Sequence, residues 1–297
     1  MNVKILLSGA ALVLAGCVVY PQPGTYAPVG PLRNVGEQTW TGYNFPESVG
    51  CDAREGVLYV SNFGGTELKP AEKDGKGFIM KVGLDGRVLE QRAFNETLNK
   101  PKGITVVGER LWVTDIDGVW VFDTRSKKGR KLAIPGIVFA NDPAVAGNTL
   151  YVSDNRGDAL FRIEPADFLD AGVQPTIATV FSKQNVNPNG LWATPGGHLL
   201  MVGFGDQPRG IQIVGPDGAI KTVVQPFGKL DGLYQLPDGS MLFTDWATGH
   251  LAHWSERGGL LPLAKDFKGP ADFCVLNDVV YVPDLVKSEI RAVRLTR

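Results

Sequence analysis

Residues 101–123 read PKGITVVGERLWVTDIDGVWVFD. Three short runs rich in Val, Ile and aromatic residues are separated by the turn-forming segments GER and IDG. Runs of this kind, each bounded by turn residues, are typical of β-strands joined by tight connections. The stretch therefore predicts three consecutive antiparallel strands.

The same pattern recurs along the chain, and its second strand is the easiest to recognise. The six second strands are LYVSN (58–62), LWVTD (111–115), LYVSD (150–154), LLMVG (199–203), MLFTD (241–245) and VYVPD (280–284). A motif that begins the first strand lies upstream of each one: PESV, PKGI, ANDP, PNGL, LDGL and PADF. A third strand and a more polar fourth strand follow, so each repeat predicts four antiparallel strands.

Six such units over residues 37–297 average about 43 residues, within the ~40 to 50 residues of a four-stranded propeller blade. We therefore predict an all-β, six-bladed β-propeller. The sixth unit stops after its third strand, EIRAVRL, and residues 37–45 can supply its missing fourth strand. Closing the ring in this way removes free sheet edges. A two-domain β-sandwich is the structural alternative, but it does not explain six equivalent motifs.

Composition excludes several classes of protein. The 37 Gly and 20 Pro among 297 residues indicate many turns without low-complexity disorder. A formal net charge of −1 offers no basic surface for nucleic acid. Three Cys residues exclude a disulfide-rich scaffold and a multi-Cys zinc cluster.

The first 36 residues are predicted to be a secretory targeting signal followed by a flexible tether. Residues 1–17, MNVKILLSGAALVLAGC, carry one Lys, a short apolar run and small residues before a Cys, as secretory signals do. The final LAGC resembles a bacterial lipoprotein lipobox. This resemblance implies removal of residues 1–16, acylation of Cys17 and, because Val18 is not Asp, an anchor in the outer membrane facing the periplasm. Residues 17–36, rich in Pro and Gly, then form a flexible tether.

Aligning the six first-strand motifs places one polar residue of each blade at the same position. These residues are Glu47, Lys102, Asn141, Asn189, Asp231 and Asp272. The first strand of a blade lines the central channel, so we expect the six side chains to converge at its mouth. Converging carboxylates raise one another's pKa unless a cation neutralises them. Carboxylate and amide oxygens favour a hard divalent cation, Ca²⁺ over Zn²⁺, and a water-filled polar channel is the alternative.

Four motifs, in this order, resemble those of the regucalcin and gluconolactonase family: PESVGCD (46–52), FAND (139–142), PNGL (188–191) and LDGL (230–233). The Glu, Asn, Asn and Asp that they contain are also similar to the ligand set of the phosphotriesterase diisopropylfluorophosphatase. The resemblance covers about residues 37–297. It implies a hydrolase of lactones or related esters that depends on a divalent cation, calcium above others.

The same resemblance implies the roles of individual residues. Glu47, Asn189 and Asp231 would hold the metal, Asn141 would contact metal or substrate, and Asp142 would lie behind them. Asp231 and Asn141 are thus the expected catalytic residues, with Asp231 placed to accept a proton.

Three further residues are candidates for contacting or supporting the substrate. The family usually carries an Arg where this chain has Phe139, so the substrate stays open. Arg156 is a candidate for contacting an anionic substrate, and Lys102 and Asp272 are candidates for contact or support.

Lys102 also opens an alternative. Its ammonium could reach Glu47 and take the place of the metal, and the protein would then be a non-catalytic, lipid-anchored propeller that binds a protein, peptide or envelope component. In either case we expect a monomer. None of the three His residues falls in a first-strand motif, so the His dyad of a paraoxonase-like lactonase is missing.

Two other sets of residues invite a structural explanation. The second strands end in Asn62, Asp115, Asp154, Asp245 and Asp284, which we assign to the turns that follow. Cys51 and Cys274 lie in blades that become neighbours on closure, four and two residues past the aligned position. We therefore expect them to be out of register and to remain buried thiols.

Overall fold

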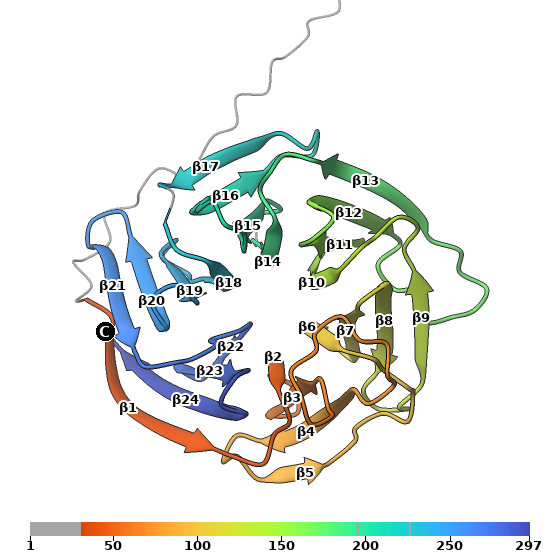
Figure 1. Ribbon diagram of the computed structural model, residues 1–297, viewed down its shortest axis with the longest axis horizontal. Helices are drawn as coiled ribbons and strands as arrows, with labels where there is room; N and C mark the ends of the chain where they lie inside the picture. The colour runs from red at the N-terminus through yellow and green to blue at the C-terminus, as the bar shows by residue number, and fades with distance from the viewer. Residues whose placement is uncertain (1–30, 195, 226) are drawn as a thin grey trace, which may run out of the picture.

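The computed structural model describes residues 31–194, 196–225 and 227–297. The expected signal peptide, Cys17 and the tether up to residue 30 lie outside the described residues. Within them, the strands form six four-stranded antiparallel sheets, arranged as blades around a central channel (Figure 1). The predicted six-bladed β-propeller is confirmed. No helix in the described ranges has the length and apolar character needed to cross a bilayer.

The first three blades follow one another without a crossover, each running outward from the channel. Blade 1 contains β2 (Pro46–Asp52), β3 (Val57–Asn62), β4 (Phe78–Gly83) and β5 (Val88–Glu90). Blade 2 contains β6 (Pro101–Val107), β7 (Arg110–Asp115), β8 (Gly118–Asp123) and β9 (Gly129–Ala133). Blade 3 contains β10 (Ala140–Ala146), β11 (Thr149–Asp154), β12 (Ala159–Glu164) and β13 (Thr176–Ser182).

The next two blades repeat this arrangement, and the last one draws on both ends of the propeller. Blade 4 contains β14 (Pro188–Ala193), β15 (Leu199–Gly203), β16 (Ile211–Val214) and β17 (Ile220–Val224). Blade 5 contains β18 (Leu230–Gln235), β19 (Met241–Asp245), β20 (His250–Ser255) and β21 (Gly259–Ala264). Blade 6 contains β22 (Cys274–Leu276), β23 (Val279–Asp284), β24 (Glu289–Thr296) and β1 (Arg33–Trp40).

The ring closes through β1, which is the outer strand of blade 6. It pairs antiparallel with β24, from Arg33 opposite Thr296 to Trp40 opposite Ile290. The predicted closure is thus confirmed, although the strand covers 33–40 and not 37–45. Pairing extends into the expected tether because β24 continues to Thr296 and offers partners that far.

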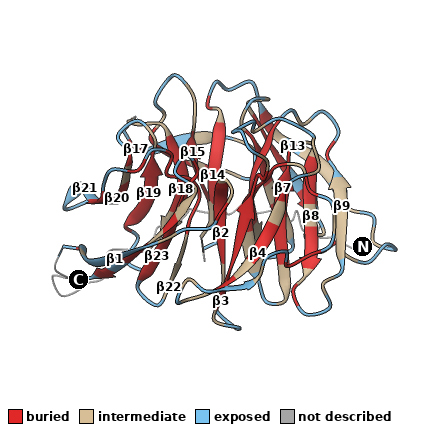
Figure 2. Ribbon diagram, turned by 60° about the horizontal axis from the view of Figure 1, so that its bottom comes forward, coloured by how far each residue is buried: buried red, intermediate tan, exposed pale blue. Residues whose placement is uncertain are grey.

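Buried apolar layers between neighbouring blades form the core. Strands β3 and β23 are buried along their whole length (Figure 2). The outer strands β5 and β17 are largely exposed. The layer between blades 1 and 6 joins side chains such as Val60 and Met80 to Tyr281 and Ile290. Because dense packing of this kind leaves little room for movement, the innermost strands present their side chains from a rigid ring.

A β-bulge recurs at the start of the first strand of every blade. In blade 5, Leu230 opposes Asp245 and Leu233 opposes Phe243, so three steps on one strand match two on the other. The irregular steps in the other blades begin at Pro46, Pro101, Ala140, Pro188 and Pro270. Bulges of this kind re-aim the side chains that they contain. We call the first residue after the start of the bulge the mouth position and the next one the inner position.

Candidate functional site at the channel mouth

Five of the six mouth positions carry the polar residues expected from the sequence. The six mouth residues are Glu47, Lys102, Asn141, Asn189, Asp231 and Ala271. The expectation was wrong for Asp272, which occupies the inner position of blade 6. The β-bridge between Ser48 and Asp272 shows that these two residues are equivalent. Aligning the motifs by their polar residues pairs Glu47 with Asp272. The bulge begins at Pro46 in blade 1 and at Pro270 in blade 6, so the residue equivalent to Glu47 is Ala271.

Glu47, Asn189 and Asp231 are brought together as buried oxygen donors. Their exposed fractions are only 5%, 3% and 5%. Oε2 of Glu47, Oδ1 of Asn189 and Oδ1 of Asp231 are buried and have no hydrogen-bond partner among the described residues. An unpaired buried polar atom costs about 1 to 3 kcal/mol, and more when it is charged. Three such oxygens at equivalent positions of one ring fit a site for a hard cation.

The two mouth carboxylates, Glu47 and Asp231, are buried close to each other with too little positive charge nearby to balance them. Burial raises the pKa of Glu47 well above its usual range, and the neighbouring Asp231 raises this pKa further. Burial also raises the pKa of Asp231, as does Asp272, although a hydrogen bond from Trp246 and the polar side chain of the nearby Asn189 offset part of the rise. A cation held by these oxygens would favour their ionised forms.

Amide oxygens are essential to such a site. In the described ranges no group of three His, Cys, Asp or Glu side chains is arranged to hold a metal ion. A cation at the mouth would therefore combine the carboxylates of Glu47 and Asp231 with the amide of Asn189. Asn141 holds the mouth position of blade 3 and is 7% exposed, so its amide is the fourth candidate donor.

Lys102 is turned toward aromatic rings and backbone. Its Nζ atom donates to the carbonyl oxygen of Lys100 at 3.2 Å and lies 4.1 Å from the centroid of the Phe139 ring. Burial lowers the pKa of Lys102 to about 8, although Glu47 acts in the opposite direction. Oε2 of Glu47 nevertheless stays without a partner in the described part of the chain. The structure therefore does not show Lys102 taking the place of a metal by pairing with Glu47.

Arg156 lies beside Lys102, against the same ring. Its guanidinium carbon is 4.1 Å from the Phe139 centroid, and its side chain is exposed. Arg156, from the loop after β11, thus contacts Phe139. Phe139 occupies the position at which the resembled family usually has an arginine.

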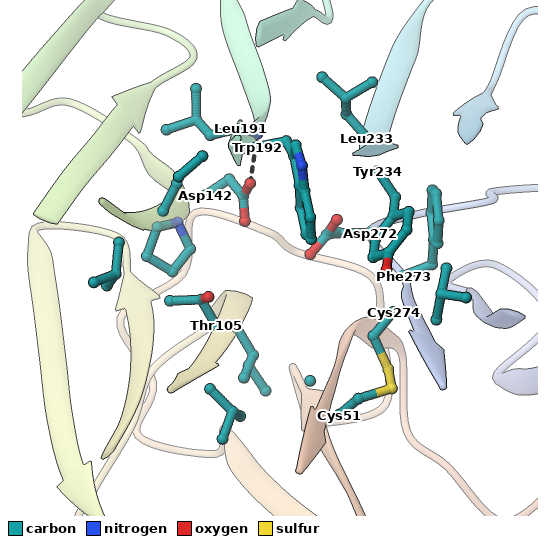
Figure 3. Close-up of a pocket in the computed structure, with 18 of the residues that line it drawn as sticks. Cys51, Thr105, Asp142, Leu191, Trp192, Leu233, Tyr234, Asp272, Phe273 and Cys274 are labelled. Atoms are coloured by element: carbon teal, nitrogen blue, oxygen red, sulfur yellow. Dashed lines mark hydrogen bonds between the residues drawn. A yellow bond between two sulfur atoms is a disulfide. The ribbon is translucent and has the colours of Figure 1, made fainter. Parts of the chain in front are cut away.

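The inner positions join neighbouring blades beneath the mouth (Figure 3). Oδ2 of Asp142, in blade 3, accepts a hydrogen bond from the backbone N–H of Leu191, in blade 4, at 2.6 Å. Gly103 must be glycine, because an added Cβ would lie 2.1 Å from Oδ1 of Asp142. Burial raises the pKa of Asp142 well above its usual range, and Asp272 raises it further.

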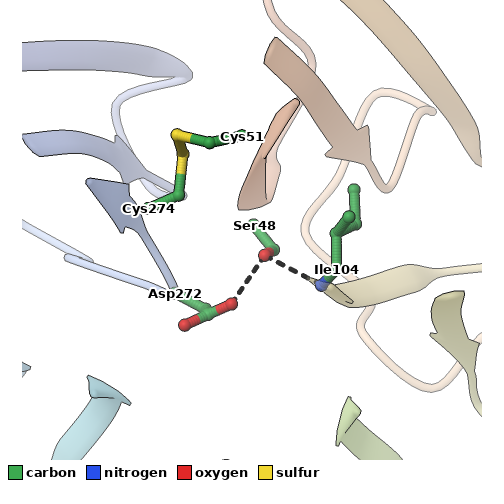
Figure 4. Close-up of a disulfide and its surroundings, with 5 residues drawn as sticks. All are labelled: Ser48, Cys51, Ile104, Asp272 and Cys274. Atoms are coloured by element: carbon green, nitrogen blue, oxygen red, sulfur yellow. Dashed lines mark hydrogen bonds between the residues drawn. A yellow bond between two sulfur atoms is a disulfide. The ribbon is translucent and has the colours of Figure 1, made fainter. Parts of the chain in front are cut away.

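Ser48 makes the same connection between blades 6, 1 and 2 (Figure 4). Its Oγ donates to Oδ2 of Asp272 at 2.7 Å and accepts from the backbone N–H of Ile104 at 3.1 Å. Burial raises the pKa of Asp272 to about 7 against the effect of this hydrogen bond. Asp142 and Asp272 thus lie in the layer next to the mouth residues and tie the blades together.

Polar residues of the second strands hold the bulges in place. The hydroxyl oxygens of Ser61, Ser153 and Thr244 accept hydrogen bonds from inner-position N–H groups at 2.8–2.9 Å. The carboxylates that end the second strands accept from backbone N–H groups of adjacent turns, as those of Asp115 and Asp245 do. The expected role in the following turns is confirmed for Asp154, Asp245 and Asp284, which accept from N–H groups of those turns. Asp115 instead accepts from Asn99 and Lys100, in the turn before the first strand of its blade.

Sequence reasoning missed Trp246. Its Nε1 atom donates to Oδ2 of Asp231 at 2.9 Å and so orients one of the two mouth carboxylates. A signal was present, because Trp246 directly follows the end of β19, and second strands end at the same face where first strands begin.

The expectation of two free thiols was also wrong. Cys51 and Cys274 form a disulfide between blades 1 and 6, with a Cα–Cα distance of 5.7 Å (Figure 4). Counted from the bridge between Ser48 and Asp272, the two cysteines are only one residue apart in register. The error in placing Asp272 therefore caused the error about the disulfide.

Comparisons with known proteins establish the fold. No family profile matches the chain, and no curated protein matches its sequence. A solved structure assigned as a candidate gluconolactonase covers 89% of this chain and 94% of its own, with a TM-score of 0.66 at 16% identity. Virginiamycin B lyase from Staphylococcus aureus covers 88% and 99%, with a TM-score of 0.58 at 15% identity. A nidogen/laminin complex covers 84% and 86%, with a TM-score of 0.56 at 16% identity. The chain thus shares its propeller with enzymes and with a protein that forms a complex.

Proposed function

We propose that this protein is a hydrolase of lactones or related esters that depends on a divalent cation at the channel mouth, calcium above others. On this proposal it is a member of the regucalcin and gluconolactonase-like propellers. The observation that carries the proposal is the set of three buried oxygens of Glu47, Asn189 and Asp231 that have no hydrogen-bond partner among the described residues. Asn141 would add a fourth oxygen.

The bound cation would supply a Lewis acid that polarises the ester carbonyl. The chain's own residues supply the rest. Trp246 fixes Asp231 through Oδ2 and leaves Oδ1 facing the ligand, and an ionised Asp231 beside the attacking water would accept its proton.

Carboxylate chemistry suits this mouth better than histidine chemistry. His250 and His253 belong to β20, a third strand, and His198 immediately precedes β15. None of the three occupies a mouth or inner position. This favours hydrolysis over a reaction that needs an imidazole base.

Arg156 and Lys102 indicate the chemistry of the substrate. Both cations lie 4.1 Å from the Phe139 ring, on the blade 2 and blade 3 side of the mouth. They favour a lactone or ester that also carries a carboxylate or another anionic group. Replacing Arg156 with Met should raise KM for such a substrate about tenfold, with little change in KM for its neutral analogue.

The N-terminus completes the proposal. Acylation of Cys17 would hold the propeller at the bacterial envelope, on the outer membrane and facing the periplasm. The propeller would act there as a monomer on small molecules.

Thermal unfolding tests the central claim. Protein stripped with EDTA should gain stability when CaCl₂ is added, by about 2.7 kcal/mol at 100 times its Kd. A panel of lactones and aryl esters should then be hydrolysed only by the calcium-loaded protein. The exposed variant Glu72→Gln is a matched control that should behave as the parent. Absence of any shift with Ca²⁺, Mg²⁺, Mn²⁺ or Zn²⁺ would remove the proposal and leave a binding propeller.

A further inference from the structure

The channel contains a cavity of about 340 Å³, and the inner positions separate this cavity from the mouth. The C-terminal halves of the innermost strands form its wall. Its rim includes Ala53 and Val107, both exposed, so the cavity reaches the surface at the face opposite the mouth. Its volume is within the range of about 300 to 1,000 Å³ that is typical of small-molecule sites.

The side wall of this cavity is apolar and aromatic. Trp192 and Tyr234, from blades 4 and 5, have ring centroids 4.3 Å apart and planes tilted by 47°. Val145, Leu233 and Val275 also line the wall. Aromatic faces attract cations as well as apolar groups.

The cavity carries charge of one sign only. Among the described residues, Asp142 and Asp272 are the only charged ones that line it, and they are 4% and 8% exposed. One oxygen of each accepts a neutral hydrogen bond, from the N–H of Leu191 and from Ser48. No Lys, Arg or His in the described part of the chain lines the cavity. In Figure 3 the two carboxylates lie on either side of the Trp192 indole.

We propose that this cavity is a second binding site, which takes a small organic ammonium ion with an apolar or aromatic body. The ammonium group would lie between Asp142 and Asp272, and the body would lie against Trp192 and Tyr234. This arrangement gives the buried carboxylates the opposite charge that they lack. A hard metal ion fits less well, because it needs 6 to 8 oxygen ligands and the walls of this cavity are mostly carbon.

Calorimetric titration with three related probes tests this site. We would titrate the folded protein, in EDTA, with phenethylammonium chloride, neutral 2-phenylethanol and sodium 3-phenylpropionate. The ammonium ion should bind at least ten times more tightly than the alcohol, and the carboxylate should not bind. No measurable binding of the ammonium ion would overturn the proposal, as would equal binding of the alcohol.

Three variants locate the binding. Thr105 is partly buried and lies on the cavity wall (Figure 3), so Thr105→Phe should fill the space and weaken ammonium binding at least tenfold. Asp272→Asn should weaken it to a similar extent. Glu72→Gln, which changes an exposed residue outside the cavity, should bind the ammonium ion as the parent does. Unchanged binding by folded Thr105→Phe would overturn the proposal, even if Asp272→Asn fails to fold.

Discussion

The indole of Trp246 holds Asp231 by a single oxygen: Nε1 donates to Oδ2 at 2.9 Å, and Oδ1 is buried without a partner in the described residues. A carboxylate fixed in this way has one oxygen committed to the protein and one available to a ligand. Trp246 therefore acts on any bound cation through Asp231.

Replacing Trp246 with Phe keeps the ring and removes the donor. Loss of a residue that orients a metal ligand typically weakens metal affinity 10- to 100-fold. We expect the calcium affinity of Trp246→Phe, measured by calorimetry, to fall about tenfold with the fold intact by circular dichroism. Unchanged affinity would show that this hydrogen bond has only a structural role. Trp254→Phe, in the neighbouring strand of the same blade, is the matched control.

Neutralising either mouth carboxylate should have opposite effects with and without calcium. Glu47→Gln and Asp231→Asn remove a buried charge, so in EDTA both should unfold at a higher temperature than the parent, by roughly 2 to 4 °C per kcal/mol gained. Both should lose most of the stabilisation by CaCl₂. If either variant kept the full calcium shift in a thermal scan, its side chain would not be a ligand.

Lys102 should weaken cation binding through its charge. The ammonium group interacts electrostatically with Glu47 and is itself buried. Lys102→Met should therefore bind Ca²⁺ more tightly, by roughly tenfold. The effect should shrink when the pH is raised past about 8, where Lys102 of the parent loses its proton. Weaker binding by Lys102→Met would mean that the ammonium supports the site.

The metal-free protein should lose stability as the pH rises toward neutrality. Burial raises the pKa of Asp272 from 3.8 to about 7, so the folded state favours the protonated carboxyl. The contribution of Asp272 is complete below about pH 3.8 and is lost as the pH rises through about 7. It amounts to roughly 4 kcal/mol at most, and Glu47, Asp142 and Asp231 act in the same direction.

Unfolding in urea at pH 5, 6, 7 and 8, in EDTA, measures this effect. We expect the free energy of unfolding to be higher at pH 5 than at pH 8. Asp272→Asn, which cannot ionise, should make the curve shallower, and the slope that remains belongs to Glu47, Asp142 and Asp231. A parent protein that becomes steadily more stable from pH 5 to pH 8 would contradict this linkage.

The disulfide should contribute strongly to closure of the ring. It joins residues separated by 223 positions, across the junction of blades 1 and 6. Closing so long a loop in the unfolded chain typically stabilises a protein by about 2 to 5 kcal/mol. Reduction, or the double variant Cys51→Ser with Cys274→Ser, should lower the free energy of unfolding by that amount. Dithiothreitol should then have no effect on the double variant, and an effect there would point to another cause.

The sequence by itself determined the repeat and therefore the propeller. Each blade is a local unit, with strand periodicity, turn residues and a bulge motif that occur within about 43 residues of one another. For the same reason Glu47, Asn189 and Asp231 could be assigned to one ring, because each lies at the same place in its own blade. Closure by the N-terminal strand could be predicted because the sixth unit has only three strands of its own.

The tertiary structure alone decided which residues meet across blades. Blade 6 pairs from Pro270, so Ala271 takes the mouth position and Asp272 lies beside Ser48. That shift of one residue brings Cys51 to Cys274. The partner of Lys102 and the donor to Asp231 were settled in the same way. These contacts join side chains from different blades or strands, and they depend on register and on the direction in which a bulge turns a side chain. Neither property is encoded in a short motif, and blades 1 and 6 contact each other only once the ring has closed.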